Sequence, residues 1–551
     1  MATDADLRRH GVRASWCKAL VVLVAGAVLA ACGGGSDDDG AAGDGSSTEG
    51  EGTSEEGAVA DPDGEITAML VQVPSTLDPG QAISTSPWPY LFEIYDRLIG
   101  RDVDNDLVPM LATEWEFSDD GLELHLSLRD DVRFNDGKQL TSADVKATLE
   151  RYKTMQGGAW AQSLDAIETV ETPSDFEVVL RLSRPSGSLP AVLSTPAGAI
   201  INADVIASGR NLATEPGRDA GSGPRVVENY VVNNRVDFVR ADDDYWDPDG
   251  NRLARVTLIR VADPVARLNA LRAGEADLIA VKLETSEQAK ALADQSDDYV
   301  YKEKEGSQHN VLFFNSREAP LDEVEVRRAI NLAVDRDAIA AFMDGDCPAA
   351  TQLFPEGQVG HDPDLDDQYT YDPDEAVKLL EQAGHPDGID ISLNLPAGAS
   401  PYEALAAVIQ EQLAKVDIRV TVTPMDAASH TTQFIAGGIS MNAGTMVTQP
   451  DSSLIVDRHF LGVQRLAVEV APEIADLAVK GEDRTVPEAE WQQAYKDIAR
   501  IAGWEKALYM PICDGKAQYL MTKDIGGFDE MPGQVDSASV EMRALYVKAQ
   551  G

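Results

Sequence analysis

The sequence predicts a mixed α/β fold, because strand-like and helix-like patterns alternate along most of its 551 residues. Apolar side chains at every second position mark strands at 122–128 and 176–182. Capping residues followed by an apolar stripe mark helices, most clearly at 372–384. The sequence has no internal repeat of roughly 20 to 50 residues, which would indicate a solenoid or a propeller.

Two segments have the period of half-buried strands. In the first, His125 lies on the face opposite the leucines, so we expect its imidazole to face solvent. The second segment follows the turn residues Pro173-Ser174-Asp175. The expected buried faces are Leu122, Leu124, Leu126 and Leu128 in the first segment and Phe176, Val178, Leu180 and Leu182 in the second.

The helix predicted over 372–384 has a start signal, an apolar face and a stop signal. Asp372 is the expected N-cap, Pro373 takes the first helical position, and Gly384 ends the helix. The expected buried face consists of Ala376, Leu379, Leu380 and Ala383.

Two further helices are predicted from their caps. Thr141 and Asp144 resemble a capping box ahead of 145–155. Asp322 is the expected cap of a helix whose apolar face is Val326, Ala329, Ile330 and Ala333. The apolar residues 312–314 just before it indicate a short buried strand.

The N-terminal residues 1–32 have the pattern of an export signal. Four basic residues up to Lys18 precede an apolar run over 19–31, which is shorter than the roughly 20 residues that a membrane-spanning helix needs. The run ends in Leu29-Ala30-Ala31-Cys32, which resembles the lipobox of bacterial lipoproteins. The resemblance implies that Cys32 is lipidated and becomes the mature N-terminus. The alternative is a plain signal peptide with an unrelated cysteine.

Residues 33–60 consist almost entirely of Gly, Ser, Ala, Thr, Asp and Glu. Such a segment has too few large apolar side chains to offset the entropy cost of ordering. We therefore expect an acidic, disordered tether between the lipid and the folded body, so that the body can search the membrane surface without leaving it. A tethered enzyme would have the same organisation.

The net charge excludes one class of partner. The sequence has 46 Lys and Arg against 94 Asp and Glu, which gives −48, the wrong sign for holding a phosphate backbone. We therefore expect no nucleic-acid partner. The acidity fits either a cationic ligand or a solvated surface that keeps an exported protein soluble, and the second is the commoner situation.

Catalytic motifs are missing from the sequence. It contains no G-x-S-x-G elbow, H-E-x-x-H helix, C-x-x-C pair or Walker A loop. The seven histidines are scattered, and paired carboxylates for glycoside hydrolysis cannot be assigned from spacing alone. We therefore expect no catalytic residue, no metal site and no cofactor. Without an ATP-binding loop, the sequence has no recognisable means of using ATP itself.

Besides Cys32, the mature chain would retain Cys347 and Cys513. Outside the cytoplasm two such residues can form a bridge, and two separate buried thiols are the alternative. Both cysteines lie near prolines, which favours turn or strand-end positions.

The body of the chain resembles the family 5 extracellular solute-binding proteins of ABC importers, a group that includes oligopeptide, dipeptide and nickel binders. The matching pieces follow one another in the same order across about 450 residues. They include TLDP at 76–79, YDRL at 95–98, LVPMLATEWE at 107–116, GSGP at 221–224, ALRAGEAD at 270–277, and VRRA with DR between 326 and 336.

This resemblance implies a two-lobed clam-shell fold with an extra domain in the N-terminal lobe, closing over a ligand by hinge motion. Lobe I would comprise 61–96, 217–307 and 510–551, the extra domain 97–216, and lobe II 308–509. Phe314-Asn315 would lie near a hinge crossover.

The resemblance also implies the partners and the place of action. A small solute or peptide would bind between the lobes, and the closed form would be recognised by an ABC permease with its ATPase subunits. We expect a monomer outside the cytoplasm, attached to the cell membrane by the N-terminal lipid.

The residues that clamp charged peptide ends in the family are missing here. The acidic residue that pairs with the peptide amine aligns with Met446, a nearby tryptophan with Ala443, and the carboxylate-binding arginine with Ser400. A short zwitterionic peptide is therefore disfavoured unless Asp451 or Arg458 substitutes. Two ligands remain open: a longer peptide held through its backbone, or an uncharged or bulky molecule such as a glycoside, a lipid-like metabolite or a chelate.

We predict a set of ligand-contacting residues, each of which has a purely structural alternative. Trp88 lies between two prolines and is also compatible with a packed loop aromatic, and Tyr402 with a helix-start residue facing the core. The set is Thr85 and Trp88 from lobe I, and Tyr402, Asn442, Thr448 and Asp451 from lobe II.

Two other classes of function are compatible with the same export signal. A surface-anchored hydrolase would need a converging nucleophile, base and oxyanion donors. A signalling or adhesion module would keep the fold without a transporter. No residue pattern supports either.

Overall fold

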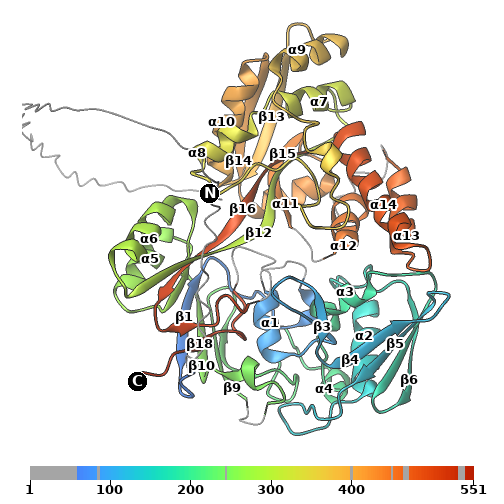
Figure 1. Ribbon diagram of the computed structural model, residues 1–551, viewed down its shortest axis with the longest axis vertical. Helices are drawn as coiled ribbons and strands as arrows, with labels where there is room; N and C mark the ends of the chain where they lie inside the picture. The colour runs from blue at the N-terminus through green and yellow to red at the C-terminus, as the bar shows by residue number, and fades with distance from the viewer. Residues whose placement is uncertain are drawn as a thin grey trace, which may run out of the picture. The chain divides into compact units, whose positions relative to one another are not determined.

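The computed structural model describes residues 59–82, 87–241, 245–397, 401–447, 451–462, 471–531 and 540–550 (Figure 1). The predicted signal peptide, Cys32 and nearly all of the predicted tether lie outside these residues. The described residues belong to one compact unit, Glu55–Gly551. Among them, none of the helices combines the length and the apolar character needed to cross a bilayer.

A mixed sheet of ten strands runs through the described residues in the order β14-β13-β15-β12-β16-β11-β1-β10-β9-β8. Two long strands stand at its middle, β12 (Tyr299–Phe314) and β16 (Tyr509–Thr522). Each is antiparallel to the other, and together they join the two lobes of the fold (Figure 1).

Lobe I holds one end of this sheet. Parallel β1–β10 and β1–β11 pairs are extended by the antiparallel strands β9 and β8. The strands are β1 (Glu65–Leu70), β8 (Arg225–Val231), β9 (Arg235–Arg240), β10 (Arg255–Arg260) and β11 (Leu278–Ala280). The helices are η1 (Pro79–Gln81), α1 (Trp88–Ile94), η3 (Pro248–Asn251), α5 (Pro264–Arg272) and α6 (Leu283–Gln295), and a short pair, β17 (Ile525–Gly526) with β18 (Tyr546–Val547), lies near the C-terminus.

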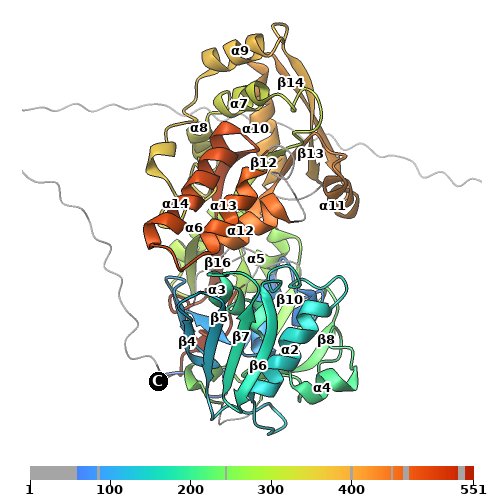
Figure 2. The same cartoon turned by 90° about the vertical axis from the view of Figure 1, so that its right-hand side faces the viewer.

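A second sheet, in the order β4-β5-β7-β6, lies within the region predicted as an extra domain. Helix α2 (Ser142–Thr154) packs against β6 and β7 (Figure 2). The strands are β4 (Ala112–Phe117), β5 (Glu123–Leu128), β6 (Ile167–Ser174) and β7 (Glu177–Leu182), with a small pair β2 (Ile99–Arg101) and β3 (Leu107–Pro109). The remaining helices here are α3 (Leu189–Leu193), η2 (Pro196–Gly198) and α4 (Ala203–Ser208).

Lobe II holds the other end of the large sheet. Parallel strands β13 (Ile389–Pro396) and β14 (Ile418–Met425) are joined through α10 (Tyr402–Ala414), and β15 (Met441–Val447) connects them to β12. The other helices are α7 (Val324–Leu332), α8 (Arg336–Phe342), η4 (Pro363–Leu365), α9 (Pro373–Gln382), α11 (Ala427–Ala436), α12 (Ser452–Val456), η5 (Asp457–Leu461), α13 (Glu473–Glu482), α14 (Glu488–Ala499) and η6 (Arg500–Glu505).

Several predicted elements are confirmed. Helix α9 starts at Pro373, the Asp372 side chain accepts the Glu375 N–H at 2.9 Å, and Gly384 has a positive φ of 88°. The capping box of α2 is present, since the Asp144 carboxylate accepts the Thr141 N–H at 3.0 Å. The predicted strands correspond to β5 and β7, whose predicted faces are buried within the strands. Leu122 precedes β5 and is exposed, and Phe176 precedes β7 and is partly buried. His125 is exposed, as predicted.

Three local expectations differ from the structure. Helix α7 is capped at Glu323, because Asp322 belongs to the preceding turn, where its N–H donates to Glu318 O at 3.0 Å. Residues 312–314 lie in a buried strand, as predicted, but the strand is not short: they form the end of β12, whose polar half is held by pairing with β16. Cys513 lies inside β16 rather than at a turn or strand end.

Candidate functional site

The connection between the two lobes contains an irregular stretch of pairing. On β12 and β16, Lys304 pairs with Ala517 and Gln308 pairs with Gly515, so three residues of one strand stand opposite one residue of the other. Such a bulge disrupts the ladder and lets the strands bend. The stretch lies closer to lobe I than the predicted crossover at Phe314-Asn315, since Asn315 is bonded within lobe II through Ser440 O at 2.8 Å.

On the lobe II side of this bulge, two neighbouring residues of β12 bind β16. The Nδ1 atom of His309 forms a short contact with the Asp514 carboxylate, and His309 is only 3% exposed. Asn310 donates to Cys513 O at 3.3 Å. These contacts attach the two crossing strands to each other directly beside the irregular stretch.

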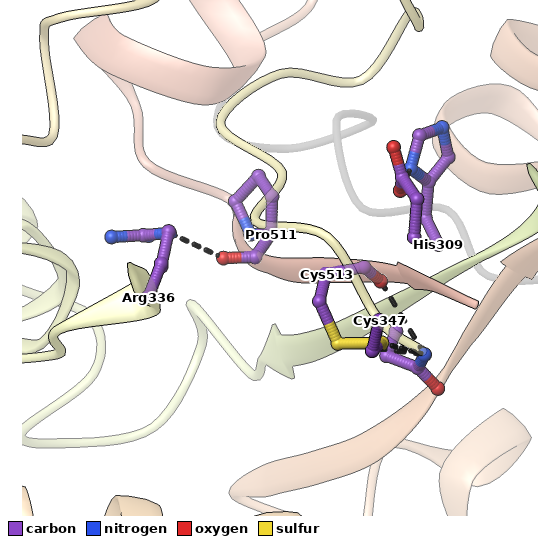
Figure 3. The surroundings of a disulfide bond; sticks show 7 residues. His309, Arg336, Cys347, Pro511 and Cys513 are labelled. Carbon is purple, nitrogen blue, oxygen red and sulfur yellow. Dashed lines mark hydrogen bonds and ion pairs between the residues drawn. A yellow bond between two sulfur atoms is a disulfide. The ribbon is translucent and has the colours of Figure 1, made fainter. Parts of the chain in front are cut away.

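A disulfide reinforces the same place (Figure 3). Cys347 and Cys513 are joined, with their Cα atoms 5.2 Å apart, and both side chains are buried. Pro511 lies two residues before Cys513, and its carbonyl oxygen accepts a hydrogen bond from the buried Arg336 at 2.7 Å. The lobe II part of β16 is therefore held at several points, although the pairing has a second register shift between Asn310 and Val311. This part includes Met510, Ile512 and Cys513, which pack in the core of lobe II, although the sequence assigned 510–551 to lobe I.

The lobes meet again where the end of α13 reaches the start of α3. The Glu482 carboxylate accepts the Ser188 N–H at 2.9 Å and the Ser188 hydroxyl at 2.8 Å, and the Gly187 N–H donates to Glu482 O at 2.7 Å. On its own lobe, Glu482 accepts the Tyr495 hydroxyl at 3.2 Å. This contact is made without any part of the large sheet.

The lobe II side of this contact is acidic and partly buried. Burial, together with the charges of Glu482 and Asp165, raises the pKa of Asp457 to about 7. Burial also raises the pKa of Glu482, and the charge of Asp451 adds to that shift. Removing water from a carboxylate favours its neutral form, so both groups hold protons more tightly here than in solvent.

Arg101 presents a positive charge from lobe I towards Asp451. Its Nε donates to Ser194 Oγ at 2.8 Å and its Nη1 to Asn105 O at 2.6 Å, while its Nη2 is buried with no hydrogen-bond partner in the described part of the chain. Burial lowers the pKa of Arg101 to about 10, and the charge of Asp451 opposes this shift. One guanidinium nitrogen of Arg101 is therefore buried and unpaired within the described residues.

Trp88 is the first residue of α1 and is 5% exposed. Its ring lies 5.7 Å from that of Trp160, whose indole N–H donates to Pro79 O at 2.8 Å. The indole Nε1 of Trp88 is buried and has no hydrogen-bond partner among the described residues. Its role in ligand binding stays a prediction.

The predicted residues from lobe II occupy separate elements. Tyr402 begins α10, is half-buried, and donates to Thr445 Oγ1 at 3.3 Å. Asn442 lies in β15 with 3% exposure, and its side-chain oxygen is 2.5 Å from His430 Nε2. Burial lowers the pKa of His430, so this imidazole favours the neutral form. The Asn442 side chain is thus engaged within lobe II.

Asp451 is the N-cap of α12 and remains partly exposed. Its Oδ1 accepts the Ser453 N–H at 2.9 Å and the Ser453 hydroxyl at 2.7 Å. Thr85 and Thr448 lie outside the described residues. Among the predicted residues that the structure describes, Asp451 interacts electrostatically with charged groups of both lobes, Arg101 of lobe I and Glu482 of lobe II.

Two positions that the resemblance to peptide binders aligned with an acidic clamp and with a tryptophan are apolar and buried here. Met446 is 1% exposed and Ala443 is 3% exposed. Ser400 lies outside the described residues. Neither described position presents a charge to a ligand.

A shallow hollow of about 490 Å³ lies on the outer face of β4 and β5, away from these residues. It is open to solvent and is lined by Pro109, Thr113, Glu114, Trp115, Glu116, His125 and Ser127. Within the described ranges, no group of three or more His, Cys, Asp or Glu side chains is placed to hold a metal ion.

Sequence reasoning missed Arg101, Ser188 and Glu482. Arg101 lies three residues after the YDRL motif and could have been noticed as an unusual cation in a short strand. Ser188 and Glu482 are 294 residues apart and carry no local signal of their contact.

Residues 106–457 match the model of the bacterial extracellular solute-binding proteins, family 5. Among curated relatives, the glutathione-binding protein GsiB of Pectobacterium atrosepticum is 27% identical over 479 residues, covering 83% of this chain and 90% of GsiB.

Solved structures share the fold across most of the chain. The binding protein AgaA of A. tumefaciens R10, in complex with agropinic acid, superposes with a TM-score of 0.76 at 26% identity, covering 89% of this chain and 99% of AgaA. DppA of Helicobacter pylori, in complex with the peptide STSA, superposes with a TM-score of 0.76 at 21% identity, covering 88% and 98%, and this likeness shows the fold. The two-lobed α/β fold and the match over 106–457 together establish that the chain belongs to the family 5 extracellular solute-binding proteins of ABC importers.

Proposed function

We propose that this protein is a membrane-tethered lipoprotein that captures a compact solute between its two lobes and delivers it to an ABC permease. The observation that carries the proposal is the pair of connections between the lobes: β12 and β16 with their bulge, and the separate contact of Glu482 with Ser188. A ligand that touches both lobes only when they are together shifts the protein towards that form. The permease would recognise the closed form.

The ligand class that we propose is a compact solute with a carboxylate, of the size of a short peptide. Glutathione, agropinic acid and the peptide STSA, named for GsiB, AgaA and DppA, share these properties. Arg101, with its unused buried nitrogen, supplies a counter-charge for such a carboxylate. A hydrogen bond between a guanidinium and a carboxylate is among the stronger polar contacts in proteins. This proposal departs from the two ligand classes that the sequence left open, a longer peptide held through its backbone and an uncharged or bulky molecule.

Native mass spectrometry of the full-length lipoprotein, extracted gently from membranes, tests the capture of a solute. We expect a co-purifying molecule whose mass identifies a carboxylate-bearing solute, and quenched or shifted tryptophan fluorescence when glutathione is added to the emptied protein. A glycoside, lipid or metal chelate instead would reject the proposed ligand class. Chemical turnover of the bound molecule would reject the binding function.

The lipid anchor has its own test. Replacing Cys32 with alanine is expected to move the protein from the membrane fraction to the soluble fraction and to remove the mass of the lipid. An unchanged membrane fraction would show that a different segment anchors the chain.

Replacing Arg101 with glutamine tests the proposed counter-charge. We expect the Kd for glutathione to rise at least tenfold, because a charged hydrogen bond of about 1.5–3 kcal/mol is lost. The matched control is Arg255→Gln, which removes a surface cation paired with Glu228. Equal Kd values for the two variants, measured by calorimetry, would exclude Arg101 from the site.

A further inference from the structure

The contact between α13 and α3 is strongly polar. Its central residue is Glu482, which accepts two hydrogen bonds on its carboxylate and one on its backbone carbonyl from lobe I. Ser188 is only 6% exposed, so these bonds lie in a place with little competing water. Hydrogen bonds to a charged acceptor in such surroundings are stronger than surface bonds.

The backbone also approaches closely at this contact. A methyl group at Gly187 would overlap the Arg484 side chain, and one at Gly121 would lie 2.9 Å from Thr485 Cγ2. Arg484 itself is held on lobe II, with its guanidinium 3.6 Å from the centre of the Trp491 ring. The loop after α13 therefore fits against two loops of lobe I and is fixed from its own side.

We propose that Glu482, Ser188 and Gly187 form an interlobe latch, which holds the lobes together at a point separate from the crossing strands. The inference rests on the proposed function, since a latch matters only if the lobes open. The latch would lengthen the time for which a ligand stays bound, although the ligand does not touch it.

Charged groups from both lobes act electrostatically on the region of the latch. The charges of Asp451 and Arg484 act on Glu482, and those of Asp165 and Arg184 in lobe I act on Asp457. Asp165 and Arg184 are paired with each other at 2.7 Å, so their charges largely cancel.

Pulsed electron spin resonance on the full-length protein measures the ratio of closed to open forms. Spin labels are attached through cysteines at Ala207 in α4 and Ala489 in α14, which are exposed residues of lobe I and lobe II. We expect a short and a long label separation. In Glu482→Ala the ratio of short to long should fall about tenfold, because the charged hydrogen bonds are lost.

A second variant separates charge from hydrogen bonding. Glu482→Gln keeps an acceptor oxygen but removes the charge, so we expect the ratio of short to long to fall less than in Glu482→Ala. The matched control, Glu356→Ala, removes an exposed carboxylate of lobe II and should behave as the wild type.

Adding glutathione, or the solute identified by mass spectrometry, separates the latch from the proposed function. If the solute shortens the separation in every variant but Glu482→Ala equals the wild type without it, the latch is wrong and the capture function stands. If the solute changes no variant, the capture function fails. If Glu482→Ala populates the long separation and the solute restores the short one, both proposals are supported.

Discussion

Replacing Cys347 and Cys513 together with alanine is expected to lower the free energy of unfolding of lobe II by about 2–5 kcal/mol. The two residues are 166 positions apart, so the bridge removes a large amount of conformational freedom from the unfolded chain. The buried sulfur atoms also pack against the core of lobe II, and their loss leaves a small cavity. Urea unfolding, followed by a probe confined to lobe II, measures the change.

The disulfide variant also tests how β16 is anchored. Arg336 and Asp514 would still hold the strand through Pro511 O and His309, so we expect solute binding to persist in the folded variant. A midpoint equal to that of the wild type under oxidising conditions would contradict the expected stabilisation. A folded variant that no longer binds would instead place the disulfide in the closure mechanism.

Replacing Arg225 with methionine is expected to destabilise lobe I by about 3–5 kcal/mol. Arg225 and Glu93 form an ion pair in which both side chains are fully buried. Removing the cation leaves the Glu93 charge buried without its direct partner, and desolvation of an unpaired carboxylate is costly. The measurement is the shift of the urea midpoint relative to the wild type.

A double variant distinguishes loss of pairing from loss of packing. Arg225→Met combined with Glu93→Gln removes the stranded charge, so we expect it to recover much of the stability lost in the single variant. The exposed pair Arg255–Glu228 provides the control, and Arg255→Met should cost less than about 1 kcal/mol. If the double variant were no more stable than the single one, packing would account for the effect.

Elements with local determinants were predictable from the sequence. Helix α9 carries its cap at Asp372, its first-turn proline and its terminal glycine within one short segment. The same holds for α2, where Thr141 and Asp144 satisfy each other. The length of β12 was not predictable, because its polar half is held by pairing with β16, which lies about two hundred positions further along the chain.

The site was less predictable than the fold, because it depends on which distant side chains meet. Trp88 is of a residue type that often contacts ligands. It packs on Trp160, however, and no local pattern in the sequence indicates this neighbour. Asn442 is likewise engaged by His430. The N-cap role of Asp451 could be recognised only once α12 was placed, since its cap partner Ser453 is also a common loop residue.

The place of β16 in the large sheet has a consequence for how the protein is made. Strand β11 pairs with β1 on one side and with β16 on the other, where Leu278 stands opposite Met521. Near the C-terminus, the buried Arg543 binds Asp96 at 2.9 Å. During synthesis, lobe I therefore lacks β16 and this anchor until residues 509–543 have left the ribosome. Late completion of this kind keeps a nascent chain loosely folded, the condition in which export machinery can thread it across a membrane.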